Sequence, residues 1–310
     1  MAEAPVAEAP VAAGWDGRSR GGRFGTAAVA WFIRLGGRDV CYLLLTVPAL
    51  WFWLTDGPAR RAITTYWSRL RGLPRWRARL YALLHFWHFA RGLADRMIAT
   101  VQPQALRFDQ LGIEGMLHAM EHPQGCILLS AHIGSFELAA RWLAGGHGRA
   151  LQVCMLDAED PRVRDQLQRT LGSRPYGVID LRDPTSAALA ITTALRRGET
   201  CCLLGDRTAG SSDGTRPVRF LNGTIRLPIG PFIAAAVTGA LVVPTFCVRR
   251  SWRTWCCAAD PPWVIDLGPR QVREERLQAV LDRWAERLET EVRQHPWAWN
   301  NYYDPWLTPE

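Results

Sequence analysis

The sequence contains no lysine, so all 37 of its Lys-plus-Arg residues are arginine. Acidic residues are missing from one long stretch: Gly57 to Ala94 holds eight arginines and neither Asp nor Glu. The first 81 residues carry 12 arginines against five acids, which accounts for seven of the net charge of +8. Such charge, interleaved with Trp67, Trp76, Trp87 and Tyr81, is typical of segments that bind anionic lipid headgroups. Nucleic-acid phosphates attract the same charge, but no nucleic-acid-binding motif accompanies it, and we expect no such partner.

Several signatures of catalysis and metal binding are also absent. No GK[ST], GxSxG or HExxH motif occurs, which argues against a P-loop, a serine-hydrolase elbow and a zinc protease. The eight cysteines form no CxxC pair, and the histidines show no metal-ligand spacing. We expect no metal, no other cofactor and no disulfide framework, and we interpret the cysteines as small core residues in a reducing compartment.

The overall composition is that of a globular chain. Of 310 residues, 48% are hydrophobic and 21% are charged, which excludes disorder, collagen and coiled coil. The 15 tryptophans are many for this length. Because Trp favours interfaces where one end of its ring lies in apolar surroundings and the other end contacts water, these tryptophans indicate contact with a bilayer.

The first 22 residues carry repeated Ala and Pro and then Gly and Arg, without a periodic apolar face. This composition predicts a disordered lead-in over residues 1–22. A basic start followed directly by an apolar run is missing, so we expect no cleaved signal peptide and no secretion.

An uncharged, almost wholly apolar run extends from Val40 to Thr55. Its 16 residues would make a helix of about 24 Å, shorter than the hydrocarbon core of about 30 Å. Pro48 is expected to kink that helix. The run therefore suits a short span, an interfacial anchor or a buried core helix, and residues 23–100 are predicted to form a hydrophobic, Arg-rich segment that associates with the membrane.

Beyond Thr100, short apolar runs alternate with amphipathic stretches, which is the pattern of an α/β domain over residues 101–310. The predicted strands are Gly125–Ala131, Ala150–Leu156, Gly177–Asp180, Thr200–Gly205 and Leu241–Val248, with a broken edge strand over Trp255–Ile265. The predicted helices are Phe136–Ala144, Pro161–Leu171, Pro184–Arg197, Gly230–Thr238 and Val272–Arg293. We expect a mixed, mainly parallel sheet between helices.

A first candidate for chemistry is His132, which follows the predicted strand Gly125–Ala131. Glu137 lies five residues on, in the first turn of a predicted helix, and could accept the Nδ1 proton of His132 and leave Nε2 free to act as a base. The backbone N–H groups of Gly134 and Ser135 at the start of this helix could bind an anion. A hydrogen-bonded structural histidine remains the alternative.

A second candidate follows the strand Thr200–Gly205, where Asp206 and Arg207 enter a Gly-rich loop that leads to Arg226. Backbone and guanidinium donors of such a loop can approach an anionic ligand closely. A solvated turn with ordinary exposed arginines is the alternative.

The joint order of these features resembles the lipid A biosynthesis acyltransferase family, the late acyltransferases of lipopolysaccharide precursors. Four features carry the resemblance over the chain from about Phe24. They are the hydrophobic segment leading into Arg60-Arg61, the His-x₄-acid motif of His132 and Glu137, the Gly205-Asp206-Arg207 motif, and the segment RFLNGTIRLPIGPFIAAAVTGALVVP over residues 219–244.

The resemblance implies a three-layer α/β acyltransferase fold with an N-terminal hydrophobic membrane-anchoring helix, at the cytoplasmic face of a bacterial inner membrane. It implies transfer of a fatty acyl chain from an acyl carrier protein or coenzyme A to a hydroxyl of a lipid or glycolipid. His132 would be the general base and Glu137 its partner. Gly134, Ser135, Asp206, Arg207 and Arg226 would position substrate or stabilise charge.

The aromatic ending, HPWAWNNYYDPW over residues 295–306, departs from the lipid A enzymes and is more similar to relatives from aryl polyene and other specialised lipid pathways. The acceptor is therefore left open, and the ending itself is predicted to cover the sheet as a lid of core aromatics. Two other functions remain open: a non-catalytic lipid-binding scaffold, and a lipid hydrolase that uses the same His and Glu on water.

Overall fold

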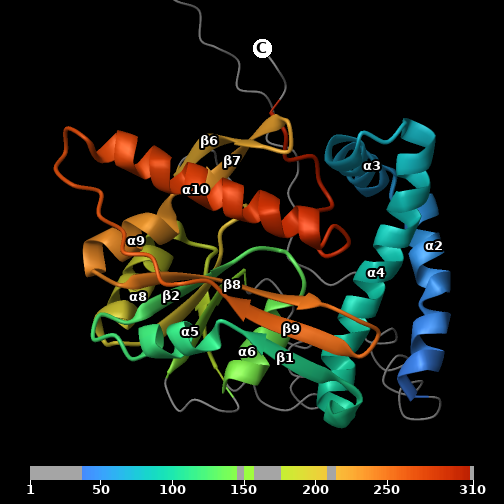
Figure 1. Ribbon diagram of the computed structural model, residues 1–310, viewed down its shortest axis with the longest axis horizontal. Coiled ribbons are helices and arrows are strands. Elements are labelled where there is room, and N and C mark those ends of the chain that lie inside the picture. The colour runs from blue at the N-terminus through green and yellow to red at the C-terminus, as the bar shows by residue number, and fades with distance from the viewer. Residues whose placement is uncertain (1–36, 145–149, 157–175, 208–213, 308–310) are drawn as a thin grey trace, which may run out of the picture.

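The computed structural model describes residues 37–144, 150–156, 176–207 and 214–307. The predicted lead-in over residues 1–22 and the predicted helix Pro161–Leu171 lie outside the described residues. The described chain builds a sheet with helices on both faces, and further helices stand beside one end of it (Figure 1).

A sheet of seven strands forms the centre, in the order β1-β9-β8-β2-β5-β3-β4. Only β8 and β9 pair antiparallel, while every other neighbouring pair is parallel. The prediction of a mixed, mainly parallel sheet is therefore confirmed. The strands are β1 (Arg107–Leu111), β2 (Cys126–Ser130), β3 (Leu151–Met155), β4 (Gly177–Asp180), β5 (Thr200–Leu204), β8 (Leu241–Arg249) and β9 (Thr254–Ala259).

The central strands are apolar throughout because both of their faces are covered. In β2, Ile127 and Leu129 pack into one core and Cys126 and Leu128 into another, on the opposite face. The first core is closed by α8 (Pro184–Arg196), α9 (Gly230–Thr238) and α10 (Arg273–Gln294), and the second by α5 (Ile113–Met120) and α6 (Phe136–Ala144). Seven of the eight cysteines are buried in this packing, and all eight are free thiols.

Before the sheet, the described chain forms a helix over residues 37–44 and then α2 (Thr46–Thr55), α3 (Gly57–Arg71) and α4 (Arg75–Val101), followed by the short 3₁₀ helix η1 (Pro103–Ala105). The chain is helical from residue 37 to a turn at Leu45, directly before α2. Pro48 explains this break, because its ring nitrogen has no hydrogen for the carbonyl of Leu44. In Figure 1, α2 and α4 run side by side next to β9 and β1.

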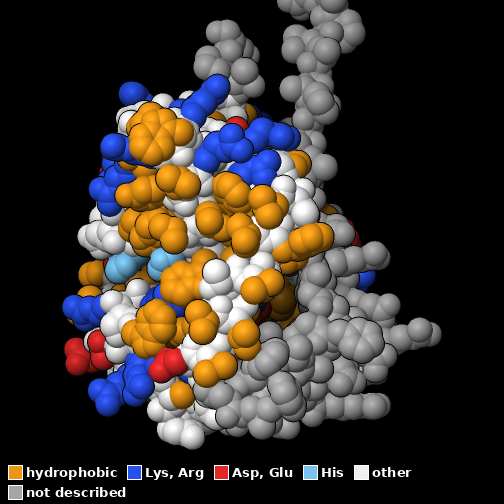
Figure 2. Space-filling model, turned by 90° about the vertical axis from the view of Figure 1, so that its right-hand side faces the viewer, with side chains coloured by type: hydrophobic (Ala, Val, Ile, Leu, Met, Phe, Trp, Pro, Cys, Tyr) orange, Lys and Arg blue, Asp and Glu red, His pale blue; other side chains and the backbone are white. Residues whose placement is uncertain are grey.

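These helices carry large apolar side chains that face outward. Val47, Trp51 and Leu54 on α2 are 70%, 63% and 57% exposed, and Trp76 and Leu80 on α4 are 61% and 55% exposed. Figure 2 shows such side chains gathered on one face, with arginines concentrated at its upper end. Within the described chain no single helix is long and apolar enough to cross a bilayer. The bent pair of residues 37–55 and Gly57–Arg71, with an angle of 96° between its helices, meets the criterion by length and composition.

Some elements of the sheet and its helices differ from the prediction. Strand β1 and helix α5 were not predicted. The prediction that the chain from Trp255 forms an edge strand is wrong, because β9 lies between β1 and β8. Strand β1 is mostly exposed, so its sequence lacks the apolar run of a central strand. The predicted Gly-rich loop continues into a hairpin of β6 (Thr215–Phe220) and β7 (Gly223–Pro228), which packs against α10.

Candidate active site

Two neighbouring parallel strands bring His132 and Asp206 together. Strands β2 and β5 pair in register up to Ser130 opposite Leu204, and each chain leaves the sheet at its carboxyl end. His132 follows β2 by two residues and Asp206 follows β5 by two. The backbone holds these ends together, since the N–H of Gly205 donates to the carbonyl of Ser130 at 2.8 Å. Carboxyl ends of parallel strands are the usual place for a ligand site.

The Nδ1 of His132 lies 2.7 Å from Oδ1 of Asp206, and the backbone N–H of His132 donates to Oδ2 of Asp206 at 3.1 Å. Burial raises the pKa of Asp206, but the charge and hydrogen bonds of His132 and the charge of Arg207 outweigh it and lower the pKa to about 2. The carboxylate is therefore ionised and can only accept hydrogen bonds, so Nδ1 of His132 carries the proton and donates it in a hydrogen bond to Asp206.

The imidazole of His132 has the properties of a general base. Burial lowers its pKa, an effect that Asp206 opposes, so the ring is neutral near pH 7 and its Nε2 is unprotonated. No described residue forms a hydrogen bond with Nε2, and 20% of the side chain is exposed. The ring can thus accept a proton from a substrate while Asp206 stabilises the resulting imidazolium.

The aromatic ending completes this arrangement, which the sequence analysis did not foresee. Trp299 is 3% exposed, and its Nε1 donates to Oδ2 of Asp206 at 3.2 Å. The next residue, Asn300, donates its backbone N–H to the carbonyl of His132 at 2.7 Å and its Nδ2 to the carbonyl of Gly134 at 3.0 Å. The ending thus packs as aromatic core, as expected, and also orients the His132–Asp206 pair.

The predicted pairing of Glu137 with His132 is wrong. The carboxylate of Glu137 forms an ion pair with Arg96 of α4 at 2.7 Å, while Nδ1 of His132 is held by Asp206. Glu137 lies in the first turn of α6, and this turn faces α4 rather than the end of β5. Its role in the structure is to join α6 to α4.

The predicted anion site at the backbone of Gly134 and Ser135 is also wrong. The N–H of Gly134 donates to the carbonyl of Ala298 at 2.7 Å, and that of Ser135 donates to the carbonyl of Cys247 at 2.9 Å. Gly134 has a φ of +74°, and a Cβ there would lie 1.9 Å from the carbonyl oxygen of Cys247. Only glycine fits this approach to β8, so the residue shapes the loop and does not bind an anion through its N–H.

The two remaining predicted arginines differ in position. Arg207 lies close enough to His132 and Asp206 for its charge to act on both groups, and its guanidinium lies 5.8 Å from the ring centroid of Tyr303. Arg226 is exposed on β7, where its Nε donates to Thr215 Oγ1 at 2.8 Å. Within the described chain no hydrogen bond or ion pair joins Arg226 to the His132–Asp206 pair, so of these two arginines the structure brings only Arg207 to the pair.

An apolar cavity lies between the sheet and α6. Ser130 and Phe136, which flank the His132 loop, contribute to its wall together with Trp142 and Leu143 of α6 and Cys202 of β5. The cavity offers space for an aliphatic group on the side of the sheet opposite to α10.

Comparisons with known proteins identify the family of the chain. A family model described as bacterial lipid A biosynthesis acyltransferase matches residues 89–308. The phosphatidylinositol mannoside acyltransferase of Mycobacterium tuberculosis (strain ATCC 25618 / H37Rv) is 26% identical over 203 residues, 63% of this chain and 59% of that protein. A protein of the same name from strain CDC 1551 / Oshkosh matches equally. The chain thus spans about three fifths of the length of these curated relatives.

Among solved structures, the 1-acyl-sn-glycerophosphate acyltransferase PlsC from Thermotoga maritima is 14% identical and aligns with 81% of this chain and 97% of its own chain. Its TM-score of 0.36 is too low to bear on fold or function.

Proposed function

The chain belongs to the bacterial lipid A biosynthesis acyltransferase family, and on that basis we propose that it transfers a fatty acyl chain from a thioester donor to a hydroxyl of a membrane lipid or glycolipid. The observation that carries the proposal is the His132–Asp206 pair. A neutral imidazole, held through Nδ1 by a buried carboxylate and open at Nε2, is the arrangement that activates a hydroxyl nucleophile.

In the proposed reaction, Nε2 of His132 takes the proton of the acceptor hydroxyl as its oxygen attacks the thioester carbonyl carbon. The tetrahedral intermediate collapses with cleavage of the carbon–sulfur bond, and the leaving thiolate takes the proton back from Nε2. The products are an ester and a free thiol. Asp206 stays ionised throughout and stabilises the imidazolium formed between the two proton transfers.

Charge that develops on the carbonyl oxygen needs a donor or a cation nearby. The N–H groups of Gly134 and Ser135 are bonded elsewhere, so we assign this role to Arg207, whose charge acts on His132 and Asp206. The apolar cavity against α6 would receive the beginning of the acyl chain. Its wall of Phe136, Trp142 and Leu143 supports an aliphatic substituent.

The donor we propose is an acyl-loaded carrier protein or acyl coenzyme A. The acceptor we propose is a lipid or glycolipid with a free hydroxyl, of which lipid A precursors are one class. The Mycobacterium relatives are named for acylation of a phosphatidylinositol mannoside, and this supports a glycolipid acceptor for the present chain.

The outward apolar side chains of α2 and α4, with Arg75, Arg77 and Arg79 exposed at the start of α4, support binding to an anionic bilayer. We propose that this face rests on the cytoplasmic side of a bacterial inner membrane. A lipid acceptor would then reach the protein without leaving the bilayer.

The proposal predicts that His132→Ala abolishes transfer, with a loss of at least about 10²-fold, the lower range for removal of a positioned base. The matched control is His118→Ala, which removes an exposed histidine of α5 and is expected to leave transfer unchanged. The measurement is mass spectrometry of total lipid extracts from cells with no protein, the wild type and each variant. The expected result is a lipid that gains one acyl chain only when His132 is intact.

Three results would contradict the proposal. Release of free fatty acid without a new ester would indicate a lipid hydrolase. A folded His132→Ala protein that acylates as well as the wild type would refute His132 as the base. A wild type that changes no lipid in a host containing glycolipids would favour a non-catalytic scaffold.

A further inference from the structure

A second cavity, of about 290 Å³, opens on the other side of the His132 loop. On α4 it is lined by His88, Arg91 and Arg96. Arg249 at the end of β8 lines it together with Ser251 and Trp252 of the turn after β8. Gly134 of the His132 loop and, in the ending of the chain, Trp297 and Asn300 also form part of the wall. Four arginines line this cavity, and no Asp or Glu is among the described residues of its lining.

Arg91 is the most unusual of these arginines. It is 4% exposed, and its guanidinium carbon lies 4.3 Å, 4.5 Å and 4.7 Å from the ring centroids of Trp252, Trp87 and Tyr42. Its Nε has no hydrogen-bond partner, and within the described chain no carboxylate lies within ion-pair distance of it. Burial is the main cause that lowers the pKa of Arg91 to about 10, and the nearby charge of Arg249 is the second. The guanidinium therefore remains charged near pH 7.

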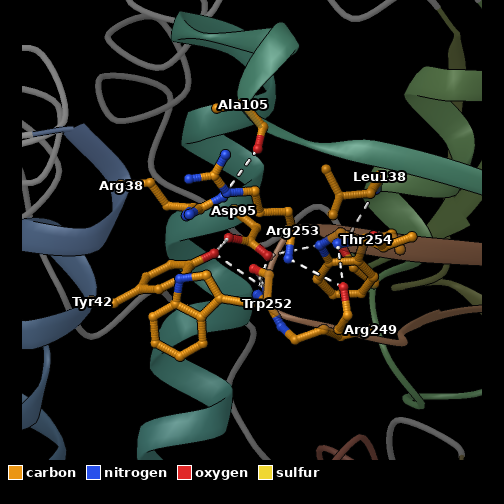
Figure 3. Close-up of polar contacts among 12 residues, drawn as sticks. Arg38, Tyr42, Asp95, Ala105, Leu138, Arg249, Trp252, Arg253 and Thr254 are labelled. Carbon is orange, nitrogen blue, oxygen red and sulfur yellow. Dashed lines mark hydrogen bonds and ion pairs between the residues drawn. The ribbon is translucent and has the colours of Figure 1, made fainter.

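The carboxylates closest to the cavity are already engaged. Asp95 of α4 is fully buried and accepts from Arg249, from the hydroxyl of Tyr42 and, at 2.7 Å, from Nε1 of Trp255. Figure 3 shows Asp95, Arg249, Tyr42 and Trp252 gathered at this place.

The other nearby carboxylates are paired as well. Glu137 is paired with Arg96 at 2.7 Å, and Asp109 lies 3.8 Å from Arg250. The charge of Asp95 also acts on Arg91, but the ion pair of Asp95 is made with Arg249, so two buried guanidinium groups share one carboxylate and Arg91 forms no ion pair within the described chain. A buried charge without a partner is costly, and an anion from outside would compensate it.

The cavity also adjoins the loop that carries His132. Gly134, two residues after His132, forms part of its wall, as does Asn300, which bonds the carbonyls of His132 and Gly134. The charge of Arg96 acts on His132. A group bound here would thus belong to a ligand that also reaches His132.

We propose that this cavity binds a phosphate ester of one of the two substrates, with Arg91 as the main cation and the indoles of Trp87 and Trp252 holding its guanidinium plane in place. Arginine suits this role because its planar donors match phosphate oxygens. This inference rests on the proposed function for the identity of the substrates. The phosphate can come from the phosphopantetheine arm of the thioester donor or from the headgroup of a phospholipid acceptor.

The test is calorimetric titration of the purified protein with two pairs of probes, each pair differing by a phosphate. The donor pair is 4′-phosphopantetheine against pantetheine, and the acceptor pair is a short-chain phosphatidylinositol against the matching diacylglycerol. The wild type is expected to prefer the phosphorylated member of one pair by about ten- to a hundredfold, the range of a charge-assisted hydrogen-bonded contact. The pair that shows the preference identifies the source of the phosphate.

In Arg91→Gln this preference is expected to disappear, while Arg91→Lys keeps part of it because the charge remains. Arg276→Gln, an exposed arginine of α10 paired with Asp266, is the matched control and should bind as the wild type does. A preference that survives in folded Arg91→Gln, or the absence of any preference in the wild type, overturns the proposal.

A second pair of variants keeps the test decisive if Arg91→Gln fails to fold. Ser251 is exposed in the β8–β9 turn, where its hydroxyl accepts from the backbone N–H of Arg253 and Thr254. Asp and Asn can both form such a turn contact. Ser251→Asp should lower the affinity for the phosphorylated probe, because the new carboxylate repels the phosphate, whereas Ser251→Asn should not. Equal affinities of the two folded variants for this probe count against the proposal.

The binding experiment needs no turnover, so its outcome is independent of the proposed reaction. His132→Ala should bind the phosphorylated probe as the wild type does. If His132→Ala loses acyl transfer but still binds the probe, His132 acts in catalysis and not in phosphate binding. If His132→Ala keeps acyl transfer, the proposed base is refuted, and the result for Arg91 is unaffected.

Discussion

At the scale of single residues, the chemistry of the site depends on which carboxylate holds His132. Asp206, 74 residues further along the chain, lies 2.7 Å from Nδ1, while the nearby Glu137 is bonded to Arg96. The carboxylate of Asp206 also accepts from Trp299, so three segments distant in the sequence determine the tautomer of one imidazole.

Asp206→Asn is expected to lower kcat/KM by about 10²- to 10⁴-fold, because an amide neither fixes the tautomer nor stabilises the imidazolium. The charge of Asp206 raises the pKa of His132, so its removal should lower that pKa. Since the base works when neutral, the acidic limb of the pH–rate profile should move to lower pH. Profiles of the wild type, Asp206→Asn and the exposed control Asp304→Asn test this, and an unmoved limb at undiminished rate would refute the assignment.

At the scale of elements, α2 and α4 present apolar stripes that nothing in the described chain covers. Val47, Trp51 and Leu54 are spaced four and three residues apart, so they lie on one face of α2. Trp76, Leu80 and Leu84 recur every four residues on α4 and are likewise exposed. Two such stripes side by side form a wide apolar surface, of the kind that marks an interaction site.

The double variant Val47→Glu/Trp51→Glu is expected to reduce binding to vesicles, because both side chains would place a charge against the bilayer and anionic headgroups. Co-sedimentation with phosphatidylglycerol-containing vesicles measures the effect, and a reduction of about tenfold or more is expected from the loss of two buried apolar side chains. Leu189→Glu on α8, where Leu189 is 70% exposed, is the matched control. Equal losses in both proteins would contradict a specific membrane face.

At the scale of the whole molecule, α4 is joined to the ending of the chain beneath the active site. His85 of α4 is fully buried, and its Nε2 lies 3.0 Å from the carbonyl oxygen of Trp299, whose indole bonds Asp206. Tyr66 of α3 donates its hydroxyl to the carbonyl of Pro296 at 2.7 Å. Helix α4, which carries part of the apolar face, and helix α3 are therefore bonded to the segment that orients the catalytic pair.

Burial lowers the pKa of His85 to about 4 from its usual 6.5, which makes the stability of the fold depend on pH. Between pH 6.5 and pH 4 the unfolded chain takes up a proton that the folded chain does not. The free energy of unfolding should therefore fall as the pH falls, by up to about 3 kcal/mol from this residue. In His85→Gln that part of the decrease should be absent.

Urea denaturation at pH 7, 6 and 5 measures the effect, with exposed His118→Gln as the control that keeps the dependence of the wild type. The other histidines are shared by wild type and variant, so the difference between the two curves isolates His85. Parallel curves for wild type and His85→Gln would show that His85 takes up its proton equally well in the folded state.

The sequence by itself determined the strands that carry the site. Apolar runs followed by polar side chains predicted β2 and β5, which have five residues each, and with them the places of His132 and Asp206. The β6–β7 hairpin, whose turn at Leu221 and Asn222 has positive φ, was not predicted, because this segment was interpreted as a Gly-rich loop. The family resemblance came from the same local patterns and is confirmed.

Only the tertiary structure decided which groups meet. Spacing along the chain places Glu137 near His132, but the path of the loop, which follows from the close approach of Gly134 to Cys247, directs α6 and Glu137 to Arg96. Strand pairing brings Asp206 to His132, and Trp299 arrives from the far end of the chain. Such contacts depend on strand order and backbone direction, which a local pattern does not contain, because residues distant in sequence become neighbours only when the sheet has formed.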